Sequence, residues 1–177
     1  MGTPCVGITG DDRDGIVSGF SAAQREVAHV LFALPEARGF ALAGGSALLA
    51  LGAIDRPTRD IDAFVAATAD VPPGDVGPLV AALRETLAAN RWTVTVDREL
   101  VTFARVLAER ADDAVEIDLA VDSPPLFAVE MKEGLPVLSG QDLAARKVLA
   151  ILDRLEGRDF TDLHALAECY SQAEVIG

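Results

Sequence analysis

Two carboxylates placed two residues apart are the first feature of this sequence that could do chemistry. Asp60 and Asp62 begin the segment 60–66, in which side chains of different character alternate as they do along a β-strand. Residues two apart on a strand project from the same face, with their Cα atoms roughly 7 Å apart. Adjacent carboxylates repel each other unless a cation lies between them. Because Mg²⁺ prefers oxygen ligands and often takes one or two carboxylates together with substrate phosphates, the pair predicts a divalent metal site.

A glycine-rich turn precedes this pair. Gly44, Gly45 and Ser46 follow the apolar segment 40–43, which is predicted to be a strand, and lead into a short apolar helix predicted over 47–53. Two glycines let the backbone approach a bulky group and expose its N–H donors. Ser46 adds a hydroxyl where the helix begins, which is a good place for an anion. Hydrogen-bond donors for phosphate beside a metal-binding carboxylate pair indicate a nucleoside triphosphate (NTP) as the ligand.

The turn between these two features is polar and carries two arginines. Thr58 lies two residues before Asp60, so that its side chain can face the site together with that carboxylate. Arg56 and Arg59 are the cations closest to the acids in the sequence. They either balance the charge of the carboxylates or contact a triphosphate, for which a guanidinium group is well shaped.

A later segment predicts a second acidic strand over 114–121. Its two faces differ in character, with Val115, Ile117, Leu119 and Val121 on one and Glu116, Asp118 and Asp122 on the other. An acidic face beside the strand 60–66 would bring a third carboxylate to the metals, whereas a solvated edge strand is the alternative interpretation. Three carboxylates around two Mg²⁺ ions are the arrangement expected for in-line phosphoryl displacement.

The combination resembles the signature of the nucleotidyltransferase superfamily of DNA polymerase beta, which is Gly-Ser, a spacer and then Asp-x-Asp. The residues Gly-Gly-Ser-Ala-Leu at 44–48 and Arg-x-Thr-x-Asp-Ile-Asp at 56–62 look more like the AbiEii/AbiGii-type toxin branch, which includes the MenT toxins. The resemblance covers roughly residues 38–168. It implies that Thr58 belongs to the motif, and it makes Asp118, in Glu-Ile-Asp-Leu, the best match to the third acid, with Glu116 as the competing candidate.

A second signature of the same branch lies in the segment 147–163, KVLAILDRLEGRDFTDL. A helix predicted from Ser139 to about residue 155 gives Lys147 partly apolar neighbours, and such a lysine ordinarily covers apolar surface with its stem. The resemblance instead implies that Lys147 acts at the nucleotide phosphates and that Asp162 or Asp159 has a catalytic or structural role. We favour Asp162 as the site residue and Asp159 as a partner of Arg158 or a cap of the last helix.

Composition and length predict one cytoplasmic globular unit. Its 177 residues are half hydrophobic, which is enough to bury a core, and no uncharged apolar run is long enough to span a membrane. The first residues lack the apolar centre of a signal peptide, and Cys5 and Cys169 read as free thiols in a reducing compartment. We predict a flexible tail over 1–18, a nucleotidyltransferase core over 19–138 and a C-terminal helical segment over 139–177 packed on that core.

The expected fold is mixed α/β, of the α+β kind, with the polymerase-beta arrangement: a small, mostly antiparallel sheet flanked by helices and followed by C-terminal helices. Periodicity and turn residues predict further helices over 21–34 and 79–89 and a loop over 69–78. They also predict a hairpin of strands 93–97 and 101–108 that turns at Arg98-Glu99, and an irregular stretch with a possible edge strand over 126–138. Trp92 is predicted at the edge of the core rather than as a platform for a base.

The predicted activity is Mg²⁺-dependent transfer of a nucleoside monophosphate from an NTP, with Mn²⁺ as the alternative ion. Its residues would be Asp60, Asp62 and Asp118 at the metals, with Asp118 also assisting deprotonation of the attacking hydroxyl, Lys147 and Asp162 in catalysis, and Gly44, Gly45, Ser46, Thr58, Arg59 and Lys147 at the nucleotide. By resemblance, the acceptor is the 3′ end of tRNA or another RNA and a cognate antitoxin is a partner.

The net charge of −13 counts against broad binding of a phosphate backbone, but it leaves room for a local basic groove that takes one RNA end. A small-molecule acceptor is the alternative enzyme reading. A fold that binds nucleotide or a partner without turnover is a third.

Overall fold

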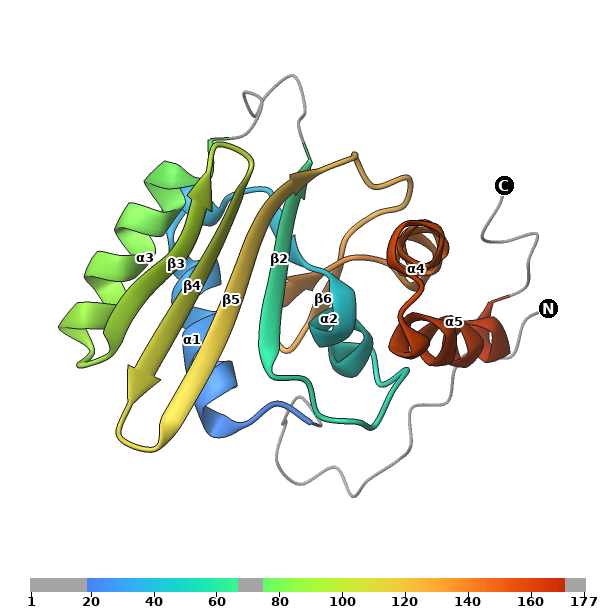
Figure 1. The fold of residues 1–177 in the computed structure, drawn as a ribbon, viewed down its shortest axis with the longest axis horizontal. Helices are drawn as coiled ribbons and strands as arrows, with labels where there is room; N and C mark the ends of the chain where they lie inside the picture. Colours follow the sequence, from blue (N-terminus) through green and yellow to red (C-terminus); the bar gives the residue numbers. More distant parts are fainter. Residues whose placement is uncertain (1–18, 67–74, 171–177) are drawn as a thin grey trace.

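The computed structural model describes residues 19–66 and 75–170, which form one sheet of seven strands with helices around it (Figure 1). The predicted tail with Cys5 and most of the predicted loop 69–78 lie outside the described residues, as does the side chain of Cys169. The strands are β1 (Phe40–Leu42), β2 (Asp60–Ala66), β3 (Thr93–Leu100), β4 (Phe103–Arg110), β5 (Asp113–Asp122), β6 (Glu130–Lys132) and β7 (Leu135–Val137).

The sheet runs in the order β3-β4-β5-β2-β1-β7-β6. Its β2–β5 and β1–β7 pairs are parallel, and the other four pairs are antiparallel. This arrangement confirms the predicted mixed and mostly antiparallel sheet. The β2–β5 pair joins two segments that are far apart in the sequence, and both of them carry the acids singled out above.

The helices are α1 (Ala22–Ala33), α2 (Gly44–Ala50), α3 (Gly77–Ala89), α4 (Gly140–Arg154) and α5 (Gly157–Cys169), with a 3₁₀ turn η1 (Pro35–Ala37). α1 and α3 cover one face of the sheet, whereas α2, α4 and α5 stand beside the other face (Figure 1). Alternation along the strands puts Ile61, Val106 and Ile117 on the face toward α1, where all three are fully buried. The core therefore lies behind the sheet, and the acids of β2 and β5 face the other way.

Three local details differ from the sequence expectation. The hairpin turns at Val101–Thr102 because a bulge next to Val96 shifts the register and lets β3 continue to Leu100. α2 begins at Gly44, so that the glycines form its first turn. The stretch 126–138 contains two short strands, β6 and β7, rather than one edge strand.

Trp92 is in the core as expected, since it is only 3% exposed and its ring nitrogen donates to the Glu26 carboxylate. None of the described helices combines the length and the apolar character that a bilayer-crossing segment needs.

Candidate active site

Three charged side chains form a row across neighbouring strands. The parallel β2–β5 register sets Asp62 opposite Asp118 and Asp60 opposite Glu116, and the β4–β5 register sets Arg105 opposite Asp118. Directly opposed residues in a sheet point to the same face, so the row Arg105, Asp118, Asp62 lies on one surface. The structure therefore brings together the three acids predicted at the metals.

Asp62 carries the strongest electrostatic signature in this row. Its Oδ2 accepts the backbone N–H of Gly45 at 3.1 Å, which satisfies a donor in the first turn of α2, where the N-cap residue supplies no side chain. Burial, reinforced by the nearby charges of Asp60 and Asp118, raises the pKa of Asp62 to about 7. The carboxylates thus crowd more negative charge together than the surrounding protein offsets, and a bound cation would relieve this.

The two glycines are required by the approach of this carboxylate. Gly44 has φ of +52°, and a Cβ atom built on it would lie 2.1 Å from Asp62 Oδ2, so that no other residue fits. A Cβ atom on Gly45 would lie 3.0 Å from the methyl group of Thr58, which is a tight contact. The N–H of Gly45 is directed at Asp62 and not at open space. The Gly44–Gly45 turn therefore orients the Asp62 carboxylate and also lines the cleft.

Ser46 and Thr58 differ in their position relative to the cleft. Ser46 is fully buried, and its hydroxyl donates to the Ala43 carbonyl at 2.9 Å and accepts the N–H of Asp62 at 3.1 Å. It therefore fixes the junction of β1, α2 and β2, and the expected contact between Ser46 and a triphosphate does not fit this orientation. Thr58 lines the cleft, and its carbonyl accepts the side-chain amide of Gln24 at 2.9 Å, which ties the turn to α1.

Asp118 is held by an arginine that the sequence reading did not identify. The Arg105 guanidinium donates to both oxygens of Asp118, through Nε at 2.8 Å and Nη2 at 2.7 Å. Asp118 is 9% exposed, so this fork fixes the orientation of a nearly buried carboxylate. Glu116 contacts the same guanidinium at 3.3 Å and is more exposed, which leaves Asp118 as the better-placed third acid.

The opposite wall of the cleft is built on a buried ion network between α4 and α5. Lys147 Nζ lies 2.9 Å from Asp159 Oδ1 and 2.7 Å from Asp162 Oδ2, and both aspartates are fully buried. Arg56 Nη2 donates to both oxygens of Asp162, at 2.7 and 2.8 Å. The hydrogen bond from Arg154, with smaller contributions from Lys147, lowers the pKa of Asp159 to about 2. Each member of this network is thus paired with a group of opposite charge type.

This network corrects two expectations. Asp159 neither caps α5 nor pairs with Arg158, because its two oxygens are taken by Lys147 and Arg154. Asp162 does not reach the cleft, and its position under Lys147 and Arg56 makes it a residue that positions these cations rather than one that touches a substrate.

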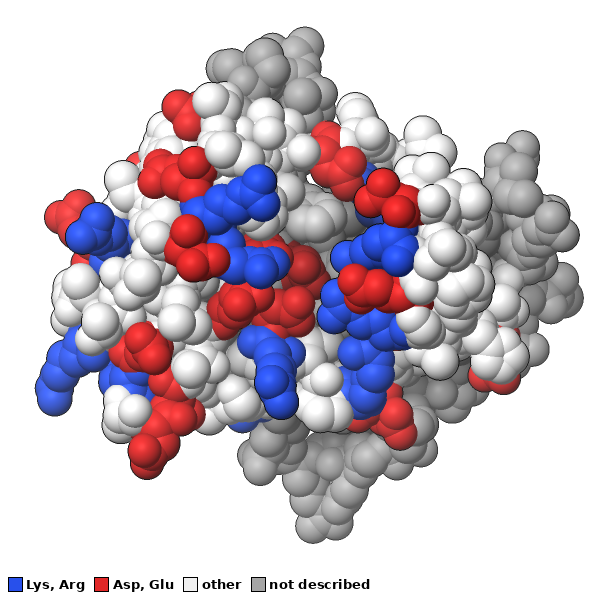
Figure 2. All heavy atoms as spheres, in the orientation of Figure 1, with Lys and Arg blue, Asp and Glu red and all other residues white. Residues whose placement is uncertain are grey.

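A cleft of about 580 Å³ separates the acid row from the Lys147 wall. Figure 2 shows acidic side chains gathered at the bottom of a hollow, with basic side chains on both sides of it. The lining includes six basic residues, Arg56, Arg105, Arg146, Lys147, Arg154 and Arg158, and six acidic ones, Asp60, Asp62, Asp118, Asp122, Asp142 and Asp153. Arg56 lines the cleft, whereas the exposed Arg59, which was expected at the nucleotide, is not part of the lining.

The donor set at the bottom of the cleft fits a hard divalent cation. Asp60 and Asp62 offer carboxylate oxygens in a crowded negative field, and Mg²⁺ is commonly held by one or two protein carboxylates together with phosphate oxygens. Among the described residues, no group of three His, Cys, Asp or Glu side chains already surrounds a metal position. Asp118 is turned to Arg105, which leaves Asp60 and Asp62 as a carboxylate pair with a third acid alongside.

Sequence reasoning missed the residues that orient this site rather than form it. Arg105 could have been found from the register, because it is the residue of β4 opposite Asp118. Asp142 accepts the backbone N–H groups of Leu126 and Phe127, at 2.8 and 3.1 Å, and so holds the segment above the cleft. In the sequence it reads only as part of a helix cap, which it also is.

Comparison with known proteins places this geometry in a family. A family model for the nucleotidyl transferase AbiEii toxin of type IV toxin–antitoxin systems matches residues 27–176. Comparison with curated protein sequences finds no match.

Solved structures share the fold at low sequence identity. A proposed nucleotidyltransferase from H. pylori superposes with a TM-score of 0.58 at 18% identity over 85% of this chain and 71% of its own. JHP933 from Helicobacter pylori gives 0.56 at 17% identity, over 82% of this chain and 65% of its own. The Megavirus polyadenylate synthase gives 0.58 at 12% identity, with 82% of this chain covering 31% of that protein.

At these identities the structures support the fold alone, whereas the family model spans most of the sequence, including the acid row and the Lys147 wall. The chain therefore belongs to the AbiEii family of nucleotidyl transferase toxins of type IV toxin–antitoxin systems, and it is a nucleotidyltransferase.

Proposed function

We propose that the protein transfers a nucleoside monophosphate from an NTP to the 3′-terminal hydroxyl of an RNA, with tRNA as the expected acceptor. One observation carries this proposal: Asp62 and Asp118 are opposed on one face of the sheet, and that face shares a cleft with Lys147 and the Gly44–Gly45 turn. Clustered acids opposite clustered cations suit a ligand that is polyanionic and arrives with divalent metal.

The triphosphate would lie on the α2 and α4 side of the cleft. Lys147 and Arg56 line that side, and their buried partners Asp159 and Asp162 keep both cations in place without filling the cleft. The Gly44–Gly45 turn lines the cleft on this side and holds Asp62 next to it. These groups together stabilise the charge that accumulates on the departing pyrophosphate.

The acceptor would enter from the opposite side, over β5 and β4. In-line displacement requires the attacking hydroxyl to approach from the side away from the leaving group. Asp118 lies one strand farther than Asp62 from the α4 wall, and Arg105 holds it there. We assign to Asp118 the acceptance of the proton from the attacking hydroxyl, because Asp118 is the acid nearest to the expected path of the acceptor.

Asp60 and Asp62 would hold Mg²⁺, or Mn²⁺ in its place. The ion supplies Lewis-acid polarisation of the phosphoryl group and neutralises developing charge. The pKa of Asp62, raised to about 7 by burial and by the nearby charges of Asp60 and Asp118, supports this assignment, since a bound cation would favour the ionised carboxylate and relieve the repulsion among the acids. Gly45 orients Asp62 for this role through its N–H, and Arg105 does the same for Asp118 through its fork.

The net charge of −13 favours a second candidate acceptor, a small hydroxyl compound that is not a polyanion. The two acceptors are separated by incubating the protein with labelled NTPs, Mg²⁺ and either total RNA or a small-molecule extract. Labelled RNA of tRNA size supports the proposal, and label in the small-molecule fraction alone supports the second candidate. If the wild-type protein binds NTP in the absence of chelator but transfers no label, both candidate acceptors are overturned.

We further propose that the toxin acts in the cytoplasm, where charged and uncharged tRNA are available, and that a cognate antitoxin counters it there. Expression of the chain alone should arrest growth, and expression of its antitoxin alongside should restore it. The Asp60→Ala variant should be harmless in the same assay. A variant that still arrests growth without transferring label would exclude nucleotide transfer as the cause.

A further inference from the structure

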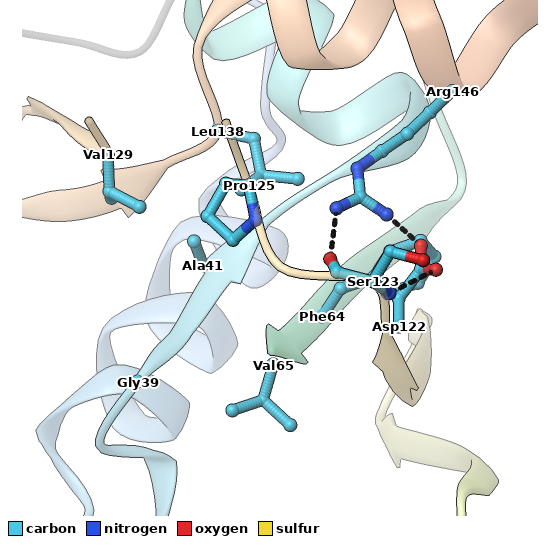
Figure 3. A pocket seen from close by; sticks show the side chains of 10 residues that line it. All are labelled: Gly39, Ala41, Phe64, Val65, Asp122, Ser123, Pro125, Val129, Leu138 and Arg146. Carbon is cyan, nitrogen blue, oxygen red and sulfur yellow. Dashed lines mark hydrogen bonds and ion pairs between the residues drawn. The ribbon is translucent and has the colours of Figure 1, made fainter. Parts of the chain in front are cut away.

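A second, smaller recess opens from the same face of the sheet. It has a volume of about 170 Å³, and Ala41 of β1 and Phe64 of β2 form its floor (Figure 3). Pro125, Val129 and Leu138 supply the surrounding apolar wall. The β1–β2 register sets Ala41 opposite Phe64, so both side chains point to the face that carries Asp62.

This recess continues the large cleft. Phe64, Asp122, Ser123 and Arg146 line both of them, so the two cavities adjoin. Phe64 follows Asp62 on the same face of β2, which separates the recess from the metal acid by one step of roughly 7 Å. A sugar would span this distance between a phosphate bound at Asp62 and a group that packs on Phe64.

The polar groups of the recess are confined to one side. The Arg146 guanidinium pairs with the Asp122 carboxylate and donates to the Ser123 carbonyl at 2.6 Å, and Figure 3 shows all three at the same end. Arg146 Nε is buried and has no hydrogen-bond partner among the described residues. The two terminal nitrogens are engaged by Asp122 and Ser123, which fixes the guanidinium plane at this end of the recess.

These features match a flat ring with apolar faces and a polar edge. A nucleobase buries both faces against apolar side chains and presents acceptors and donors only at its rim. Arginine forks match acceptor pairs on base edges, and carboxylate or carbonyl oxygens match exocyclic amino groups. The volume is below that of sites for whole drug-sized ligands, so the recess suits one heterocycle and not an entire nucleotide.

We propose that this recess binds the nucleobase of the NTP, with Arg146 and Asp122 at the base edge and Phe64 beneath the ring. The inference rests on the proposed function and adds to it the subsite that selects the nucleotide. Most of the recess lies over β1 and β2 beside α4, which is the side assigned to the triphosphate, and only the end of β5 at Asp122 closes it on the side assigned to the acceptor. The base of the NTP therefore fits this position better than a base of the acceptor.

The test compares binding of the four NTPs and of inorganic tripolyphosphate, in the presence of Mg²⁺. Val129→Trp should fill the recess from its rim, because Val129 is 41% exposed and can be enlarged without repacking the core. Met131→Trp is the matched control, since Met131 lies in the nearby strand β6, is 64% exposed and lines neither cavity.

We expect Val129→Trp to weaken NTP binding about 10-fold, the scale of one lost base contact, and to leave tripolyphosphate binding unchanged. Met131→Trp should change neither. Unchanged NTP affinity in a folded Val129→Trp variant would overturn the inference, and a rise confined to the KM of the RNA acceptor would assign the recess to the acceptor instead. Wild type that binds neither NTP nor tripolyphosphate would overturn the proposed function itself.

Arg146→Lys tests the edge contact, because lysine keeps the positive charge but loses the fork. The ratio between the tightest and the weakest of the four NTP affinities should fall about 10-fold, with tripolyphosphate affinity unaltered. An equal loss for all four NTPs would show that Arg146 only supports the loop at Ser123 and would remove it from base selection.

Discussion

Lys147 and Asp162 meet 2.7 Å apart between α4 and α5, and neither is appreciably exposed to water. Removing one partner of such a pair leaves an uncompensated buried charge, which typically costs 3–5 kcal/mol. Asp162→Asn should therefore lower the free energy of unfolding by about 3 kcal/mol and also reduce activity, because Lys147 and Arg56 lose their common anchor. Urea denaturation followed by helical circular dichroism measures the change. Glu168→Gln, on an exposed position of the same helix, should leave the denaturation midpoint unchanged.

The pKa of Asp62 predicts how the stability of the metal-free protein depends on pH. Its folded-state pKa of about 7 lies above the unfolded value of 3.8, so the favourable contribution of protonated Asp62 is full below about pH 4. It is then lost as the pH rises through 7. In the presence of a chelator, the wild-type melting temperature should fall by roughly 5–10 °C between pH 5 and pH 8, for a change of about 2–3 kcal/mol.

Asp62→Asn should flatten this dependence, whereas Asp112→Asn, at an exposed position, should retain it. Millimolar Mg²⁺ should raise the wild-type melting temperature more at pH 8 than at pH 5, since the ion competes with the proton at this carboxylate. A wild-type profile that is already flat between pH 5 and pH 8 would contradict the assignment of charge crowding to Asp62.

Asp60 supplies charge to the cluster and should be needed for chemistry rather than for folding. Its negative charge contributes to the raised pKa of Asp62, so replacing Asp60 relieves repulsion. Asp60→Ala should reduce nucleotide transfer at least about 100-fold, as expected for loss of a metal ligand, with no fall in melting temperature. Transfer of radiolabel from NTP to RNA gives the rate. A fully active variant would show that the metal is held elsewhere.

The glycines of the turn allow a graded test. Gly44→Ala combines a left-handed backbone, which costs roughly 1–2 kcal/mol, with a Cβ atom 2.1 Å from Asp62, so activity and stability should both be lost. Gly45→Ala meets only the methyl group of Thr58 at 3.0 Å and should be milder. Gly52→Ala is the control for strain alone, because Gly52 has φ of +69° but no atom near its Cβ position. If Gly44→Ala behaves like Gly52→Ala, the approach of Asp62 is not what requires glycine.

The sequence predicted the parts of this site that depend on strand alternation. Asp60, Asp62 and Asp118 share a face because alternation fixes sidedness within each strand, and the family resemblance supplied the neighbourhood of β2 and β5. The direction of the Ser46 hydroxyl could not be read in this way, since it depends on the backbone of Ala43 and Asp62 converging on one buried oxygen. One-dimensional patterns do not record such convergence.

The ion partners were the least predictable feature. The sequence alone does not decide whether Asp159 or Asp162 contacts Lys147. Only the packing of α5 on α4 determines that both are buried and that Arg154 also pairs with Asp159. Arg105 was overlooked because its pairing with Asp118 follows from the register of β4 and β5, and the bulge in the preceding strand displaced the predicted hairpin turn.

The location of Lys147 and its two aspartates also sets an order of events during synthesis. The two walls of the cleft belong to segments that are synthesised at different times. The last residue of the acid row is Asp118, whereas the cationic wall also needs Asp162. A chain without α5 would lack Asp159 and Asp162 and would leave Lys147 and Arg56 without their buried partners. The cationic wall therefore depends on the packing of α5 against α4, whereas the acid row depends on the sheet alone.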